Sequence, residues 1–286
     1  MVAALSERRN VHRDSWHGRL DVGFARTAER TLFERRHVQM PLALQRPFYP
    51  EGPSVCHVLM LHPPGGMVGG DRLDISFDLD AGAEALVSTP SAAKWYRGLR
   101  PAYQDVRHRV ASAAHFEWLP QETIIFSGAD VRQRLRVELA AEASWLGWEV
   151  TRFGRSARDE TFDDGAWRMN TEVWREGSPL WIDRQHLAGG SRMLNSAYGL
   201  GGAPVIATLA WIGTAVGPEI VDAARELWHS AKLDGEAGVT RLQHGMLCRY
   251  RGSSSAAARA WFIAVWDKVR SQYRGSAACA PRIWRT

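Results

Sequence analysis

The chain has 286 residues, of which 45% are hydrophobic and 23% charged. This composition is sufficient for a large buried core and excludes a disordered, self-repelling chain. The formal net charge is +5, and all but three of the 36 basic residues are arginines, the lysines being Lys94, Lys232 and Lys268. The arginines are scattered along the sequence and form no single run. We therefore expect an ordinary solvated surface and no nucleic-acid partner.

Cysteine usage and hydropathy favour a cytoplasmic protein. Cys56, Cys248 and Cys279 lie far apart, form no Cys-x-x-Cys pair and predict no disulfide framework. No apolar signal core follows the first charged residues. The longest apolar stretch, 203–217, is interrupted by polar residues, glycine and proline, and it is shorter than the roughly 20 residues that span a bilayer. We expect no membrane partner.

Apolar residues alternate with period two along most of the chain, which is typical of half-buried strands. The alternation is clear at 20–24, 73–79 and 131–139, and Gln133 is the polar break in the last of these. The sequence therefore predicts a mainly β fold.

A weak internal repeat accompanies this alternation. Leu79–Ala83, Val110–Ala114 and Leu139–Ala143 can be superposed, and they begin 31 and 29 residues apart. Each joins an alternating strand to a second apolar strand through small residues. This spacing favours a layered or solenoid-like stacked β-sheet structure. Three ordinary hairpins of a β-sandwich are the alternative.

Two helices are predicted, both in the C-terminal half. The segment Pro218–Ala231 places apolar residues on one face, with proline in the first turn. The second helix runs from Ala256 to about Tyr273, capped by Ser254 or Ser255. No linker divides the chain. We expect a weakly ordered N-terminus (1–15) followed by one domain (16–286).

The most distinctive segment is a turn between two apolar strands, from His62 to Asp71. It contains Pro63, Pro64, Gly65, Gly66, Gly69 and Gly70. Prolines followed by glycines enforce a turn, which can hold His62 and Asp71 close together. No Gly-Lys-Ser/Thr follows, so the turn is not a phosphate-binding loop. A rigid β-connection with a buried histidine is the alternative to a metal or catalytic site.

Carboxylates occur within apolar strands at Glu117, Glu122 and Glu149. A carboxylate in such a place is costly unless it is paired or lines a wet cavity. A buried ion pair with arginine is one explanation, and a polar channel whose carboxylates meet a cation is the other. The sequence contains no zinc-ligand pairs, nucleophile elbow or dinucleotide-binding motif, so we predict no catalytic residues.

The sequence resembles the urease accessory protein UreD family, also called UreH. The resemblance is carried by an ordered series of segments: the His62–Asp71 turn with Arg72 and Leu73, Ser91–Arg97, Glu117–Phe126, Leu146–Glu149 with Gly154 and Arg155, Arg249–Arg251, Ala260–Phe262 and Pro281–Trp284. The segment at Lys94 departs from the pattern by carrying Trp95, and the N-terminal strand diverges. We assign no partner contacts there.

The resemblance implies a non-enzymatic scaffold or chaperone in urease maturation. Such a protein joins UreF and the GTPase UreG in a hetero-oligomeric complex, able to pair as a dimer of complexes. This complex docks on the apo-urease subunits and assists nickel insertion. The resemblance implies no tightly bound cofactor, but nickel in transit through the interior. A conduit should bind weakly at several points, and here the transient path would use His62, Asp71, Glu122 and Glu149.

Two rival functions remain open. Glu117 and Glu122 would suit the carboxylate pair of a β-solenoid carbohydrate-active enzyme. The thirteen tryptophans, five of them at 145–181, would then form sugar-stacking platforms, although core packing also explains them. A nucleic-acid binder that uses its arginines is the second rival. Neither explains the ordered series of motifs.

Overall fold

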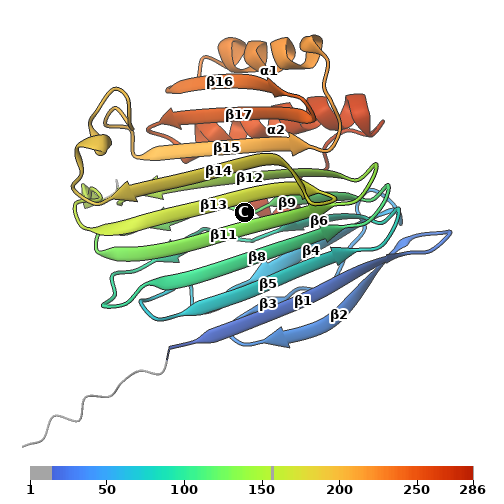
Figure 1. The fold of residues 1–286 in the computed structure, drawn as a ribbon, viewed down its shortest axis with the longest axis horizontal. Coiled ribbons are helices and arrows are strands. Elements are labelled where there is room, and N and C mark those ends of the chain that lie inside the picture. The colour runs from blue at the N-terminus through green and yellow to red at the C-terminus, as the bar shows by residue number, and fades with distance from the viewer. Residues whose placement is uncertain (1–14, 156–157, 286) are drawn as a thin grey trace, which may run out of the picture.

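The computed structural model describes residues 15–155 and 158–285. The N-terminal stretch 1–15, predicted to be weakly ordered, lies outside the described residues except for Ser15. The described residues form two β-sheets packed face to face, with two helices on the outer side of one sheet (Figure 1). The mainly β fold and the two helices of the C-terminal half are confirmed.

The sheet that faces the viewer in Figure 1 is called the front sheet. Its strands are β1 (His17–Arg26), β2 (Thr31–Gln39), β5 (Arg72–Leu79), β8 (Ala102–Val110), β11 (Ala129–Leu139), β13 (Gly165–Arg175) and β14 (Ser178–Ala188). They lie in the order β14-β13-β11-β8-β5-β1-β2. The five central strands are parallel, and β14 and β2 are antiparallel to their neighbours.

The second sheet is called the back sheet. Its strands are β3 (Ala43–Leu44), β4 (Val55–Leu61), β6 (Glu84–Ser88), β9 (His115–Leu119), β12 (Ser144–Phe153), β15 (Val205–Ile212), β16 (Glu236–Leu242) and β17 (Gly245–Gly252), with the short β7 (Ala93–Trp95) and β10 (Thr123–Ile125) paired beside the end of β12. The main order is β16-β17-β15-β12-β9-β6-β4-β3.

The repeat seen in the sequence corresponds to coils of the chain. Each coil runs from a front strand through a small-residue turn to a back strand and then returns to the front sheet, and the first two coils return through the short strands β7 and β10. Leu79, Val110 and Leu139, which start the three repeat segments, are register partners on adjacent parallel strands. The solenoid-like prediction is confirmed. The hairpin alternative is wrong, because the two strands of each repeat lie in different sheets.

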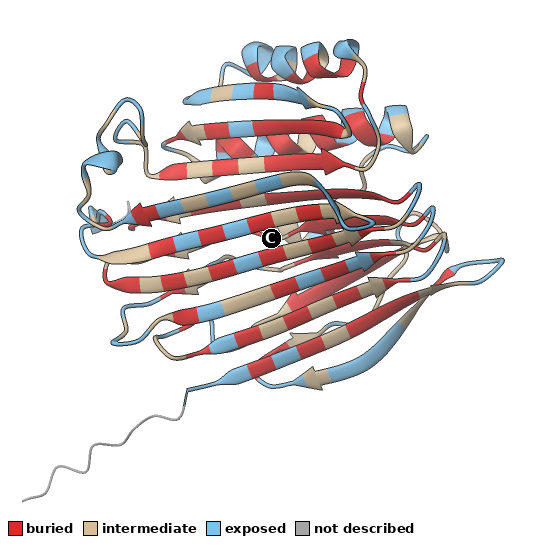
Figure 2. Ribbon diagram, in the orientation of Figure 1, coloured by how far each residue is buried: buried red, intermediate tan, exposed pale blue. Residues whose placement is uncertain are grey.

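The main core lies between the sheets. Alternate residues of each strand point inward, and Figure 2 shows this as alternating buried and exposed bands on the front sheet. Phe24, Phe77 and Phe116 pack together, with ring centroids 5.6–6.5 Å apart. Gln133, the polar break in β11, also points inward and is buried.

A second core lies between the back sheet and the helices α1 (Pro218–Ala231) and α2 (Ser255–Tyr273). Both predicted helices are confirmed. α2 begins one residue earlier than expected, and its cap is Ser254, whose side chain accepts a hydrogen bond from the Ala257 amide. In the described part of the chain, neither helix is apolar enough over a sufficient length to cross a membrane.

Eleven of the thirteen tryptophans belong to these cores or pack against them, and the other two are Trp16 and Trp174. All thirteen lie in the described part of the chain, and Trp16 is the only one among them classed as exposed. A short 3-10 helix, η2 (Arg192–Leu194), precedes β15. Trp284 follows α2 and belongs to a further short 3-10 helix, η3 (Arg282–Arg285). Its indole donates to Ser88 Oγ at 2.9 Å and contacts Trp148 and Trp266. Core packing therefore explains most of the tryptophan content.

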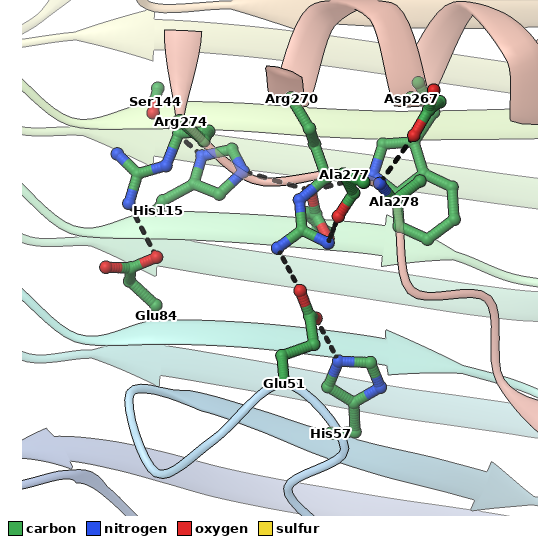
Figure 3. A network of polar contacts seen from close by, with 12 residues as sticks. Glu51, His57, Glu84, His115, Ser144, Asp267, Arg270, Arg274, Ala277 and Ala278 are labelled. Carbon is green, nitrogen blue, oxygen red and sulfur yellow. Dashed lines mark hydrogen bonds and ion pairs between the residues drawn. The ribbon is translucent and has the colours of Figure 1, made fainter.

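A buried ion-pair network joins α2 to the back sheet (Figure 3). Arg270 of α2 is 2% exposed and lies between two carboxylates, 2.7 Å from Glu51 and 3.3 Å from Glu117. Glu51 also contacts His57 of β4 at 2.6 Å. One guanidinium thus compensates two carboxylates that come from distant parts of the chain, so the network fixes the helix layer against the back sheet.

We predict that Arg270→Met lowers the free energy of unfolding by about 3–5 kcal/mol, because it leaves buried carboxylates without their cation. Urea unfolding followed by circular dichroism measures the change. The matched control Arg241→Met, at an exposed site on β16, should change the free energy by no more than about 0.5 kcal/mol. Equal unfolding midpoints for Arg270→Met and the wild type would show that the network does not stabilise the helix layer.

Candidate functional site between the two sheets

A cavity of about 90 Å³ lies between the sheets, beside the 89–92 loop and β7. A water molecule needs roughly 10–15 Å³ of such space, so the cavity can hold several. Gly65 and Ser91, both exposed, lie at its rim beside the His62 turn. Its wall combines many apolar residues with ten polar or charged ones, which are His62, Thr89, Ser91, Lys94, Gln104, Gln121, Thr123, Gln133, Arg134 and Glu149.

A second, smaller cavity of about 20 Å³ adjoins the first. The two cavities share the side chains of Leu135, Glu149 and Met169. The second cavity extends between β14 and β15, where Asp183 and Thr208 belong to its wall. The two cavities together are called the passage. The passage runs from the His62 turn to the edge between β14 and β15, and Glu149 lies where the two cavities meet.

Glu149 points into the passage because of its place in β12. Alternate residues of this strand face opposite sides, so Trp145 and Phe153 face the space between the sheets together with Glu149, while Trp148 faces the helices. Burial raises the pKa of the Glu149 carboxyl to about 7. The long hydrogen bond that it accepts from Trp118 Nε1 at 3.4 Å only partly offsets this.

Glu149 takes part in none of the ion pairs found in the described part of the chain. In this respect it differs from Glu117. Burial alone would raise the pKa of Glu117, but a hydrogen bond from His115 and the charge of Arg270 hold that pKa below its usual value. For Glu117 the ion-pair explanation is therefore correct. For Glu149, which faces the passage, the polar-channel explanation stays a prediction.

Polar side chains in the wall of the passage are hydrogen-bonded to one another. Gln133 donates to Gln104 Oε1 at 2.9 Å and accepts from Trp167 Nε1 at 3.0 Å. These three side chains come from adjacent parallel strands of the front sheet. Sequence reasoning did not name Gln104 or Gln133 as site residues, although the break in the apolar alternation at Gln133 was a usable signal.

The His62 turn forms one mouth of the passage. Its backbone pairs with the next coil, where Met67 N donates to Lys94 O and Tyr96 N donates to Met67 O, both at 2.8 Å. Gly66 is needed for this approach, since a Cβ there would collide with the Tyr96 ring and the Lys94 carbonyl oxygen. Burial lowers the pKa of His62, and the nearby charge of Asp71 opposes the shift.

The structure places the other two predicted path residues outside the cavity walls. Asp71 is buried and accepts hydrogen bonds from the amides of Trp16 and Val68, both at 2.9 Å, so it holds the turn together. Glu122 pairs with Arg259 of α2 at 3.4 Å. Of the four predicted residues, the structure therefore brings His62 and Glu149 to one cavity.

Neither a closed metal site nor a glycosidase site emerges. The described residues contain no group of three or more His, Cys, Asp or Glu side chains arranged to hold a metal ion. The Glu117 side chain is 1% exposed and bonded to His115, Trp266 and Arg270. It cannot contact a polysaccharide, so the proposed carboxylate pair of Glu117 and Glu122 is wrong.

We predict that Glu149 makes stability fall as the pH rises. Its folded-state pKa of about 7 lies above the ordinary value of 4.5, so the native state binds the proton more tightly than the unfolded chain. The resulting stabilisation is complete below the ordinary pKa and is lost as the pH passes 7, by about 3 kcal/mol in total.

Glu149→Gln should remove this dependence. The variant's free energy of unfolding, relative to the wild type, should increase by up to about 3 kcal/mol between about pH 5 and about pH 8. Urea titrations at the two pH values measure it. Glu226→Gln, at an exposed site on α1, is the control. Parallel curves for Glu149→Gln and the wild type would mean that Glu149 titrates at an ordinary pKa.

Comparison with known proteins gives a consistent result. The family model described as "UreD urease accessory protein" matches residues 17–285. A protein of Trichormus variabilis named "Urease accessory protein UreD" is 50% identical over 275 residues, covering 96% of this chain and 97% of the relative. Relatives of the same name from Nostoc punctiforme and Pseudomonas fluorescens are 50% and 41% identical, and each alignment covers 95% of this chain and 97% or 96% of the relative.

Proposed function

Because the chain belongs to the UreD family of urease accessory proteins, we propose that it acts in the cytoplasm as a scaffold of urease maturation that passes nickel to apo-urease. In this proposal it joins UreF and the GTPase UreG, and the complex docks on the apo-urease subunits. The sequence contains no phosphate-binding loop, so GTP hydrolysis falls to the partner.

The observation that carries the nickel step is the position of Glu149 at the junction of the two cavities. Nickel(II) accepts imidazole and carboxylate ligands, and the passage offers His62 at one mouth and Glu149 at its middle. The first cavity has room for several waters, so a cation can keep part of its hydration shell. Single, separated ligands bind weakly enough for release.

The raised pKa of Glu149 suits transit. A carboxyl group with a pKa near 7 is partly protonated at neutral pH. A metal cation must displace this proton to bind, so part of the binding free energy is spent on proton release. When the cation leaves, the proton can return and neutralise the buried site. Such a ligand attracts nickel without holding a permanent charge inside the protein.

We predict that Glu149→Ala and Glu149→Leu both reduce urease activation several-fold while leaving the complex intact. Alanine removes the ligand, and leucine also fills the junction with an apolar group. Urease activity and the nickel content of purified urease measure delivery, and size-exclusion chromatography with UreF and apo-urease measures assembly. Glu226→Leu is the control outside the passage. Undiminished activation by both Glu149 variants in intact complexes would reject the conduit.

The scaffold role has its own test. We predict that this chain, co-expressed with its UreF partner, captures apo-urease from cell lysate, and that cells lacking the gene make urease without nickel. Immunoblotting for the urease subunits and metal analysis of the enzyme are the measurements. Normal urease maturation in the deletion strain, or absence of urease from the captured material, would overturn the role itself.

A further inference from the structure

The outer face of the front sheet is open. Both helices contact strands of the back sheet, and in the described part of the chain neither packs substantially against the front sheet (Figures 1 and 2). The outward side chains of the front sheet therefore form a broad solvated surface. The coil register decides which of these side chains lie next to one another.

One row across this face is entirely free of carboxylates. It follows register partners through β1, β5, β8, β11, β13 and β14, and consists of His17, Arg72, Tyr103, Arg132, Arg168 and His186. The arginines of this row are far apart in the sequence, and the coil repeat stacks them in space. The scattered arginines of the sequence thus become a localised feature of the fold.

The adjacent row contains acidic residues only on β5 and β8. It consists of Arg19, Asp74, Asp105, Arg134, Asn170 and Arg184. Asp74 and Asp105 lie on β5 and β8, and both pair with Arg72, at 2.9 and 2.7 Å. Toward β14 the two rows leave Arg132, Arg134, Arg168, Arg184 and His186, which together are called the arginine cluster.

The positive charge of the cluster is only partly compensated. Asp130 holds Arg132 at 3.0 Å, and Glu172 lies 4.0 Å from Arg184 but 2.6 Å from Arg136. Arg134 and Arg168 take part in none of the ion pairs found in the described part of the chain. Arg132 and Arg168 are also direct register partners, and like charges placed opposite each other destabilise a sheet.

We propose that the arginine cluster is a docking surface for a protein partner with a carboxylate-rich face. Guanidinium groups bind carboxylates in a bidentate geometry, and a partner bearing them would replace the repulsion by ion pairs. The exposed Ile182 is the register partner of Glu172 beside the cluster, so apolar contact is available too. Interfaces between proteins combine arginine with apolar side chains in this way.

The same observations favour a protein over a nucleic acid. Asp130 and Glu172 lie within or beside the cluster, and their carboxylates would repel a phosphate backbone. A protein surface can meet them with its own cations, because its charges are mixed. The proposed function enters this inference only through the choice of proteins used to test it.

The test compares two double variants with the same change in net charge. Arg168→Glu/Arg184→Glu reverses two exposed charges of the cluster, and Arg30→Glu/Arg241→Glu reverses two exposed charges elsewhere. Arg134 is left unchanged because it also lines the passage. Binding to purified UreF and to purified apo-urease is measured by calorimetry at low and physiological salt.

We expect the cluster variant to bind at least one of the two proteins about tenfold more weakly or worse, with a weaker dependence on salt. The control should bind like the wild type. Equal affinity of wild type and cluster variant for every protein that the wild type binds would overturn the proposal. Circular dichroism and the unfolding midpoint establish folding, and Arg168→Gln/Arg184→Gln replaces the double glutamate variant if that does not fold.

Two further probes separate the remaining outcomes. If the wild type binds neither protein, the proposed function fails, and binding of a polyglutamate peptide then tests the docking surface. Weaker peptide binding by the cluster variant alone supports the docking surface. Equal peptide binding by both variants overturns it. A short duplex DNA is the other probe. Duplex binding at physiological salt that the cluster variant alone loses, with protein binding unchanged, would assign the surface to nucleic acid and overturn the proposal.

Discussion

Parallel pairing of strands about 30 residues apart in the sequence is the constraint on which the molecule depends. Backbone hydrogen bonds fix which residues are neighbours across a parallel sheet, and a shift of one residue would turn every side chain to the opposite face. With this register, Leu79, Val110 and Leu139 form one layer of the core. The same register places Gln104 beside Gln133 on the passage wall and aligns distant arginines on the open face. Core, passage and surface are thus three results of one pairing pattern.

The local features of this pattern were predictable from the sequence, because they depend on residues close together in the chain. The superposition of three small-residue turns, the bounds of α1 and the Ser254 cap of α2 all follow from short-range periodicity and capping chemistry. The role of Glu122 was not predictable, since its partner Arg259 is far away in sequence. Asp71 has one local partner, the Val68 amide, but its bond from the distant Trp16 amide was not predictable. Glu117 and Glu149 both stand among apolar residues, yet the first faces the helices and the second the space between the sheets. The difference is which face of the back sheet each side chain occupies, and composition does not encode this.

Glu117 and Glu149 show how the surroundings of a carboxyl group change its proton affinity in opposite directions. Glu117 has a guanidinium and an imidazole beside it, so its charge is retained and holds two layers together. Glu149 has one long indole hydrogen bond, and its proton affinity is raised instead. A tightly paired carboxylate is a poor ligand for a passing cation, whereas an uncompensated one next to water-sized cavities is available. The guanidinium group of Arg270 is therefore what distinguishes the surroundings of Glu117 from those of Glu149.

The network around Arg270 also has a consequence for the order of folding. Glu51 and Arg270 are widely separated in the chain, and residues that follow α2 complete the site, since Arg270 donates to the Ala277 carbonyl and the Ala278 amide donates to Asp267. Successive coils can pair with their neighbours as they leave the ribosome, as in other solenoids. The ion pairs cannot close until residues 270–278 have been synthesised. During translation Glu51 and Glu117 are therefore made long before Arg270, and they stay without its guanidinium group until nearly the whole polypeptide has been synthesised.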